Sequence, residues 1–221
     1  MLYRLILEAR HHAYDKRRKK SQKATLPTIC IGNVTVGGTG KTPHTEMLLR
    51  LLSSHKGVAV LSRGYGRKSK GFLIVKPSGS SREFGDEPLQ IARKFPSRTV
   101  AVDKDRIEGC AKLKEMDEKM VILDDAFQYR KLQADLNIVL INYNRPVFDD
   151  RLLPFGRLRD LPERIFKADM LIVSKCPEDI SLEEKIEFSR KLHLKDFNSE
   201  TCSALCPNGR HIDLLFSTIK Y

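Results

Sequence analysis

Short apolar, β-branched runs alternate along the chain with segments whose apolar residues recur at helical spacing. The runs predict strands over residues 28–31, 58–61, 72–75, 99–102, 121–123, 136–141 and 170–173. The periodic segments predict helices over residues 42–52, 88–95 and 106–116. Continuous apolar strands that alternate with helices are typical of a parallel sheet covered on both faces. We therefore expect an α/β fold with a mostly parallel sheet and helices on both of its faces.

The helix over residues 42–52 has a predicted apolar side made of Met47, Leu48, Leu51 and Leu52. The N-terminal segment predicts a second amphipathic helix, in which the apolar residues are Leu2, Leu5, Ile6, Ala9 and Ala13. A basic run over residues 16–20 follows it. Residues 1–23 hold eight Lys and Arg against two acidic residues, which is half of the chain's net charge of +12.

A basic amphipathic helix suits the surface of an anionic membrane. It is equally compatible with a helix packed on its own domain and followed by a solvated basic tail. A nucleic-acid-binding arm is disfavoured because few aromatic residues lie among the charges, so we expect no nucleic-acid partner.

The composition fits a globular protein, with 41% hydrophobic residues. No apolar run is long enough to span a bilayer, and the N-terminus lacks the pattern of a secretory signal. Five scattered cysteines predict free, buried thiols in a reducing compartment. We divide the chain into a basic N-terminal helix (residues 1–24), a core (residues 25–176) and the start of a second lobe (residues 177–221). That last segment predicts a helix over residues 182–194 and a strand over residues 214–219.

A glycine-rich loop lies between the first predicted strand and the helix after it, which is the setting of a phosphate-binding P-loop. The expected nucleotide contacts are Thr35, Val36, Gly37, Gly38, Thr39, Gly40, Lys41 and Thr42. The glycines let backbone N–H groups turn toward phosphate oxygens. Lys41 supplies a charge for the β- and γ-phosphates, and the Thr42 hydroxyl suits Mg²⁺. The motif is a variant, because Thr35 stands where the common pattern has glycine.

A P-loop needs an acid near the end of a neighbouring strand to hold Mg²⁺. Asp124 and Asp125 directly follow the apolar run over residues 121–123. Two carboxylates after a buried strand are costly unless a cation or hydrogen bonds meet them. We therefore predict a magnesium site there.

Five blocks in order along the chain resemble the tetraacyldisaccharide 4'-kinases, the lipid A 4'-kinases. They are residues 32–43 (GNVTVGGTGKTP), 61–67 (LSRGYGR), 85–88 (GDEP), 124–128 (DDAFQ) and 153–159 (LPFGRLR). The resemblance implies a P-loop NTPase-like fold with ATP and Mg²⁺ as cofactors. It implies transfer of the ATP γ-phosphate to the 4'-hydroxyl of a tetraacyldisaccharide 1-phosphate, giving lipid IVA. It also implies a peripheral protein on the cytoplasmic face of the bacterial inner membrane, which favours the membrane interpretation of the basic helix. We expect a monomer.

The resemblance also implies roles for single residues. Asp86 corresponds to the base that takes the proton of the sugar hydroxyl, although Asp86 alone is equally compatible with a helix N-cap. Lys41 and Asp125 are the other catalytic candidates. The candidates for substrate contact are Arg63, Gln128 and Arg159, with Arg67 and Arg106 as further cations for anionic groups. The metal candidates are Thr42, Asp124 and Asp160, where Asp160 replaces the family's Glu.

The chain departs from the family in two respects. Tyr129 stands where the family commonly has His, and a phenol is no acid or base near neutral pH. The family continues beyond the length of this chain into a lobe that supplies a supporting histidine. His193 and His211 lie in no matching motif, and we expect both at the surface. Cys202 and Cys206 are interpreted as unrelated thiols.

Two alternatives to the kinase stay open. One is a P-loop switch ATPase of the partitioning or metal-delivery type. Such proteins carry a further lysine where Val36 stands, and they lack the block at residues 85–88. The other is a catalytically incomplete remnant that binds nucleotide.

Overall fold

The computed structural model describes residues 2–218 and forms two compact units. The first unit takes in Gly32–Gly40 together with the described parts of Met1–Arg18 and Leu136–Tyr221. The second unit consists of Lys19–Ile31 and Lys41–Asp135. The division predicted at residues 24 and 176 was drawn from sequence blocks and stays a prediction.

The second unit is built on five neighbouring strands in the order β2, β6, β3, β5, β4. Their bounds are β2 (Thr28–Gly32), β3 (Val58–Ser62), β4 (Leu73–Ile74), β5 (Val100–Val102) and β6 (Met120–Asp124). All pairs are parallel except β4 with β5. The helices are α2 (Lys41–Leu51), α3 (Ser81–Phe84), α4 (Asp86–Lys94) and α5 (Arg106–Glu115). A separate parallel pair joins β1 (Gln22–Lys23) to β7 (Leu132–Gln133).

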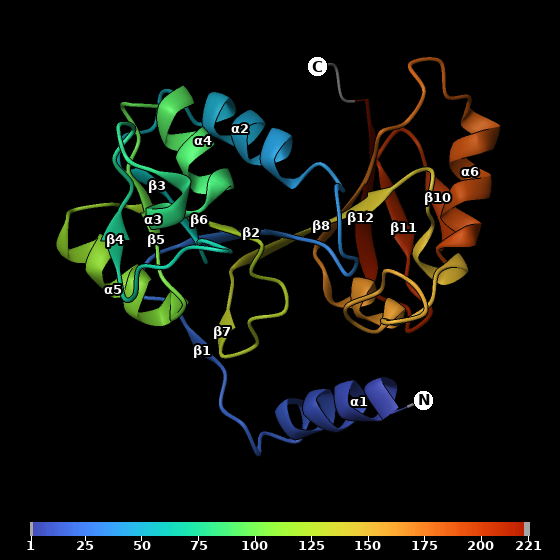
Figure 1. Cartoon of the computed structure of the whole chain (residues 1–221). Helices are drawn as coiled ribbons and strands as arrows, with labels where there is room; N and C mark the ends of the chain where they lie inside the picture. The colour runs from blue at the N-terminus through green and yellow to red at the C-terminus, as the bar shows by residue number, and fades with distance from the viewer. Residues whose placement is uncertain (1, 219–221) are drawn as a thin grey trace. The chain divides into compact units, whose positions relative to one another are not determined.

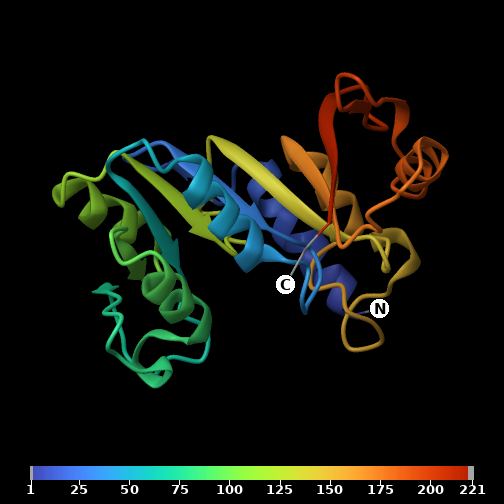
Figure 2. The same ribbon diagram turned by 90° about the horizontal axis from the view of Figure 1, so that it is seen from above.

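Helices cover both faces of these strands. The connection from β2 through α2 to β3, and the connection from β3 through β4 and α4 to β5, both move toward the β4 edge of these strands. The connection from β5 through α5 to β6 moves in the opposite direction. Right-handed crossovers therefore put α2 and α4 on one face and α5 on the other, as Figures 1 and 2 show. Every residue of β3 is buried, as expected of a strand covered on both sides.

The first unit continues the α/β pattern. Its strands lie in the order β10 (Lys195–Asn198), β11 (Ser203–Leu205), β12 (His211–Ser217), β9 (Met170–Ser174), β8 (Leu136–Asn142). Strands β8, β9 and β12 are parallel, whereas β10 and β11 are antiparallel additions. Helix α6 (Leu182–Lys191) begins with a capping box between Ser181 and Glu184. Two 3₁₀ turns, η1 (Val147–Asp149) and η2 (Pro162–Lys167), lie between β8 and β9.

The predicted α/β fold is confirmed. Each strand and helix expected between residues 28 and 173 is present, with bounds that differ by two residues or fewer. The helix expected over residues 182–194 ends at Lys191, and the strand expected over residues 214–219 is β12, which begins at His211. Residue 219 lies outside the described residues. The short strands β1, β7, β10 and β11 and the one-turn helix α3 were missed, because none is longer than four residues and so none shows a clear period.

The predicted apolar side of α2 is wrong. The buried residues of α2 are His44, Thr45, Glu46 and Leu49, whereas Met47 and Leu51 are exposed. Glu46 explains why a different side of α2 is buried from the one predicted. Its buried carboxylate accepts hydrogen bonds from Gln90 and Lys94 of α4 and from Arg50. These polar contacts, together with the loop before α2, set which side of the helix faces the protein.

Helix α1 (Leu2–Asp15) is the N-terminal helix in Figure 1. Its buried residues are Leu7 and His11 alone. Its predicted apolar residues lie mostly on the other side: Leu2 is 73% exposed, Leu5 55% and Ile6 54%. The amphipathic helix is therefore present, but its apolar face does not pack on the described protein. Within residues 2–218, no helix has the length and apolar character needed to cross a bilayer.

Candidate nucleotide and phosphoryl-transfer site

The glycine loop has the backbone shape that its sequence predicts. Gly37 has φ +100° and Gly40 has φ +81°, values in the region that side chains disfavour. Asn33 Nδ2 donates to Thr39 Oγ1 at 2.7 Å, and Ser174 Oγ donates to the Thr39 carbonyl at 2.8 Å. Both contacts are buried, so side chains beneath the loop fix its conformation.

The extended segment over residues 157–159 pairs with residues 34–36, which lead into the glycine loop. The Val36 N–H donates to the Arg157 carbonyl at 2.7 Å, and the Arg159 N–H donates to the Val34 carbonyl at 2.9 Å. Thr35 and Leu158 form an antiparallel bridge between these contacts. Thr35 is therefore extended and paired, which explains why the loop of this chain tolerates a β-branched residue where the common pattern has glycine.

Two cations of the first unit lie close to the loop glycines. A Cβ on Gly37 would lie 3.7 Å from Arg157 Nη1, and a Cβ on Gly38 would lie 3.7 Å from Lys175 Nζ. Neither cation was predicted from the sequence to have a role. The signal for Lys175 was its place directly after β9, since ligands bind at the carboxyl ends of parallel strands.

In the second unit, Lys41 begins α2 and Asp125 follows β6. Lys41 Nζ lies 3.8 Å from Asp125 Oδ1, and both side chains are largely buried. The backbone of Asp125 is left-handed, with φ 52°, and its N–H donates to the Ile31 carbonyl at 2.9 Å. A left-handed backbone is uncommon for a non-glycine residue, although aspartate adopts it more readily than most.

Asp124, the last residue of β6, is 1% exposed, and neither of its carboxylate oxygens has a hydrogen-bond partner among the described residues. Burial, and then the neighbouring Glu87 and Asp125 carboxylates, raise the pKa of Asp124 to about 7. An unpaired buried carboxylate is costly unless a cation meets it. Lys41 and the Ser62 hydroxyl act on this pKa in the opposite sense. By their chemistry, the Asp124 carboxylate oxygens and the half-buried Thr42 hydroxyl at the start of α2 are the kind of oxygen donors that suit Mg²⁺.

The burial of the Asp124 carboxylate can be tested by measuring how Asp124→Asn changes the stability of the protein. A carboxyl whose pKa is raised on folding stabilises the fold at low pH, and that contribution is lost as the pH rises through about 7. Asp124→Asn should therefore raise the melting temperature at pH 8 with chelator present, and the gain should shrink toward pH 4. Because burial raises the pKa of Asp124 from 3.8 to about 7, the gain in the free energy of unfolding has an upper limit of roughly 4 kcal/mol. Mg²⁺ should then stabilise the wild type more than the variant. A variant less stable than the wild type at pH 8 would contradict this account.

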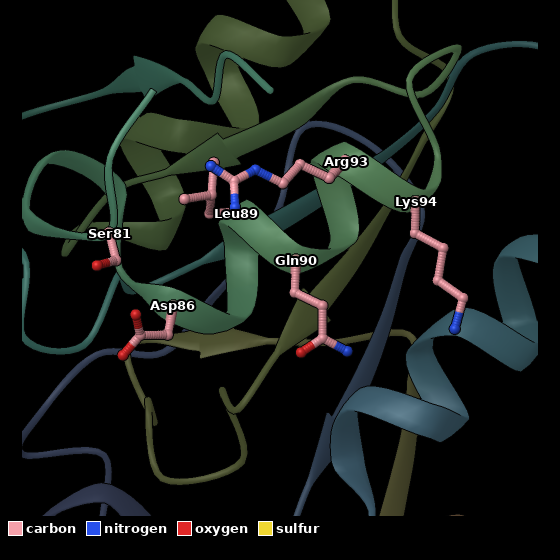
Figure 3. A pocket seen from close by; sticks show the side chains of 6 residues that line it. All are labelled: Ser81, Asp86, Leu89, Gln90, Arg93 and Lys94. Carbon is pink, nitrogen blue, oxygen red and sulfur yellow. The ribbon is translucent and has the colours of Figure 1, made fainter. Parts of the chain in front are cut away.

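Asp86 and Glu87 open helix α4. The N-cap is Gly85, with φ 91°, and Asp86 is the first helical residue, so the alternative that Asp86 is the N-cap is wrong. Among the described residues, no hydrogen bond or ion pair involves the Asp86 carboxylate. Asp86 lies in an open cavity of about 510 Å³ together with Ser81, Leu89, Gln90, Arg93 and Lys94 (Figure 3). Glu87, to which the sequence analysis gave no role, is the neighbouring carboxylate with the largest effect on Asp124.

A pair of cations lies near the acidic pair in the second unit. Arg106 is buried, and burial followed by the charge of Arg63 lowers the pKa of Arg106, while Asp125 and Asp124 act in the opposite sense. Arg63 itself is exposed. Arg106 Nη1 donates to the Asp103 and Lys104 carbonyls at 3.3 and 3.0 Å, and its guanidinium lies over the Tyr129 ring, so these contacts hold the side chain in place. Its role toward anionic groups stays a prediction. Arg67 is different, because it donates to Ser69 and to the Gly71 carbonyl of its own loop.

Tyr129, the departure from the family's His, takes a structural role. Its hydroxyl donates to Asp105 Oδ1 at 2.9 Å, and Asp105 caps the N-terminus of α5. The hydrogen bond and burial raise the pKa of Tyr129, so the phenol stays protonated. Gln128, one residue earlier, is half-buried, and its role in substrate contact stays a prediction.

The remaining predicted residues lie in the first unit. Arg159 Nη2 donates to Asn33 Oδ1 at 2.5 Å, and Asp160 Oδ1 lies 2.6 Å from His11 Nε2. The metal role of Asp160 stays a prediction. His193 and His211 are exposed, as expected, and His193 stacks on Phe148. All five cysteines are free, and only Cys202 is not buried.

A strand, a glycine loop and a helix that starts with Lys41-Thr42, followed by an acid at the end of a nearby parallel strand, define an α/β protein of the P-loop NTPase class. The sequence profile of the tetraacyldisaccharide-1-P 4'-kinase family matches residues 1–211, and the chain belongs to this family.

Known proteins agree with this assignment. The tetraacyldisaccharide 4'-kinase of Porphyromonas gingivalis is 47% identical over 184 residues, which cover 81% of this chain and 52% of that protein. The protein of the same name from Bacteroides thetaiotaomicron is 44% identical over 196 residues, covering 87% and 52%. The crystal structure of the "apo" form of LpxK from Aquifex aeolicus in complex with ATP superposes with a TM-score of 0.72 at 43% identity, covering 78% of this chain and 55% of that one. The chain thus spans about half the length of the curated relatives it matches.

Proposed function

We propose that this chain is a lipid kinase of lipid A biosynthesis. It transfers the γ-phosphate of ATP to the 4'-hydroxyl of a tetraacyldisaccharide 1-phosphate and gives lipid IVA. The observation that carries the proposal is the buried Asp124 carboxylate, which has no hydrogen-bond partner among the described residues, next in sequence to Asp125, which pairs with Lys41. Lys41 directly follows the glycine loop. Family membership supplies the acceptor, since the relatives are named for that reaction.

In this proposal residues 35–42 hold the triphosphate. Backbone N–H groups of the loop and the N-terminus of α2 bind its oxygens, and Lys41 meets the β- and γ-phosphates. Mg²⁺, when bound, neutralises charge on the phosphates. Thr42 and Asp124 would hold it in the second unit, and the metal role of Asp160, a residue of the first unit, stays a separate prediction. Arg157 and Lys175 add charge next to Gly37 and Gly38.

Asp86 accepts the proton of the sugar hydroxyl as that oxygen forms its bond to the γ-phosphorus. The bond between the γ-phosphorus and the β,γ-bridging oxygen breaks, and ADP leaves. Asp125, 3.8 Å from the Lys41 ammonium, fixes that cation in place for the phosphate oxygens. In the second unit, Arg63 and Gln128 are the candidates for contact with the anionic and polar groups of the acceptor. The same role for Arg159, a residue of the first unit, stays a prediction. The open cavity beside Asp86 gives a bulky acceptor access to this carboxylate.

One assay separates the kinase from its alternatives. The purified chain is incubated with γ-labelled ATP, Mg²⁺ and the tetraacyldisaccharide 1-phosphate, and label is counted in lipid and in free phosphate. Label in the lipid is the expected result. Free phosphate without labelled lipid would favour the switch ATPase, and nucleotide binding without turnover would favour the remnant.

We also propose that α1 attaches the protein, as a monomer, to the cytoplasmic face of the inner membrane. The support is the exposed apolar side of α1 at Leu2, Leu5 and Ile6, followed directly by the basic run over residues 16–20. Apolar side chains of such a helix enter the headgroup region, while Lys and Arg attract anionic lipid. A lipid substrate requires this kind of access.

Leu5→Glu should weaken binding to vesicles of phosphatidylcholine and phosphatidylglycerol by about tenfold or more. Burial of one leucine is worth about 1.5–3 kcal/mol, and the new charge adds to that loss. Leu182→Glu is the matched control, because Leu182 is also an exposed leucine on a helix of the first unit. Vesicle co-sedimentation measures both. Equal binding by the two variants would place the membrane surface elsewhere.

A further inference from the structure

The buried side of α1 contacts the segment that frames the glycine loop. Tyr3 Oη donates to the Arg159 carbonyl at 2.9 Å, and His11 Nε2 lies 2.6 Å from Asp160 Oδ1. Tyr3, Leu7 and His11 are spaced by four residues and so form one stripe along the helix. Leu7 and His11 are its buried members. One side of α1 therefore attaches to two consecutive residues, 159 and 160.

Those two residues are bonded in turn to the loop. The N–H groups of Arg159 and Asp160 both donate to the Val34 carbonyl, at 2.9 and 3.3 Å. The Arg159 guanidinium donates to Asn33 Oδ1, and Asn33 donates to Thr39 Oγ1 within the loop. All of these residues belong to the first unit. A continuous set of hydrogen bonds thus runs from α1 to the residue between Gly38 and Gly40.

The Asp160 carboxylate links His11 to these hydrogen bonds, so a change at His11 affects them. Asp160 is 1% exposed, and its Oδ1 is met by His11 Nε2 and by the Leu161 N–H at 2.9 Å. A buried carboxylate that loses a hydrogen-bond partner is left under-satisfied, which is costly, and this cost favours a rearrangement of the groups around it. The backbone N–H of the same residue is one of the two that hold Val34.

We infer that His11 is a positioning residue for the nucleotide loop: α1 does not only attach the protein to a membrane but also holds the loop in its phosphate-binding shape through Asp160. The inference rests on the proposed function, since it takes the loop to bind a triphosphate. It divides α1 between two tasks, with His11 and Tyr3 on the loop side and Leu2, Leu5 and Ile6 on the membrane side.

The test measures the dissociation constant of the β,γ-imido analogue of ATP by calorimetry, with and without Mg²⁺. His11→Ala should weaken binding by about tenfold, equivalent to ~1.4 kcal/mol, in both conditions. His11→Gln, whose amide can donate to Asp160, should recover most of the affinity. His12→Ala is the matched control, because His12 is the exposed neighbour on the same helix, and it should bind like the wild type. Binding of His11→Ala to anionic vesicles should stay unchanged, which shows that α1 is still formed.

Tyr3→Phe is the second variant, since it removes one hydroxyl and keeps the ring. It should weaken nucleotide binding by a few fold without loss of folding. Wild-type affinity in a folded His11→Ala protein would overturn the inference and leave the proposed function intact. A loss seen only with Mg²⁺ would assign His11 to the metal site and overturn it too. A wild-type chain that binds no nucleotide would overturn the proposed function and the inference with it.

Discussion

Lys41→Ala should lower the turnover number by about 10²–10³-fold and also raise the dissociation constant for ATP. The Lys41 ammonium lies 3.8 Å from Asp125 at the start of α2, so its position is fixed before the nucleotide arrives. A preorganised cation stabilises the charge that develops on the transferred phosphate, and removal of one such donor typically costs this much in rate. The cation also meets the ground-state phosphates, and for that reason affinity should fall together with rate.

The control for Lys41 is Lys56→Ala, an exposed lysine of the same unit, which should leave both quantities unchanged. Steady-state kinetics and calorimetry measure the two effects separately. If Lys41→Ala turned over like the wild type, phosphate would have to bind outside this loop.

Asp86→Asn should separate rate from nucleotide affinity. General bases contribute about 10²–10⁴-fold to rate, so the turnover number should fall within that range. The affinity for ATP should change by less than about twofold, because Asp86 lies at the start of α4 and the triphosphate is bound by residues 35–42. The expected loss is thus in the chemical step alone.

Glu83→Gln, which neutralises an exposed acid on the short helix before Asp86, should retain full turnover. Single-turnover measurements with labelled ATP and lipid acceptor report the chemical step for both variants. Unaltered turnover in Asp86→Asn would end its assignment as the base, and Glu87 would then be the next carboxylate to test.

The fold could be predicted because its strands are continuous apolar runs. A strand in a sheet covered on both faces is apolar at nearly every position, so the local sequence alone reveals it. The side of α2 that faces the protein could not be predicted in this way. Glu46 is buried there against Lys94 and Gln90, which lie more than 40 residues away in the sequence, so no local period reveals it. Propensity and periodicity act locally, whereas that contact is tertiary.

The part of the candidate site that lies in one contiguous motif could be predicted from the sequence. The parts that depend on contacts between residues far apart in the sequence could not. Residues 37–42 are contiguous, and their sequence alone indicates phosphate binding. Thr35 was noted as a departure, but its pairing with Leu158 explains it only in three dimensions. The contact of His11 with Asp160 joins residues 149 positions apart, and no spacing rule points to it. Gly85 as the N-cap, in place of Asp86, was likewise visible only from backbone angles.

The central claim is that this chain phosphorylates the 4' position of a lipid disaccharide, and the most direct test is the structure of the product. After incubation with ATP, Mg²⁺ and the tetraacyldisaccharide 1-phosphate, a two-dimensional phosphorus–proton spectrum of the extracted lipid locates each phosphate. We expect a new phosphomonoester signal correlated with the proton at the 4' carbon, beside the original signal of the 1-phosphate. A lipid that keeps only its 1-phosphate while ATP is consumed, or a new phosphate at another position, would contradict the account.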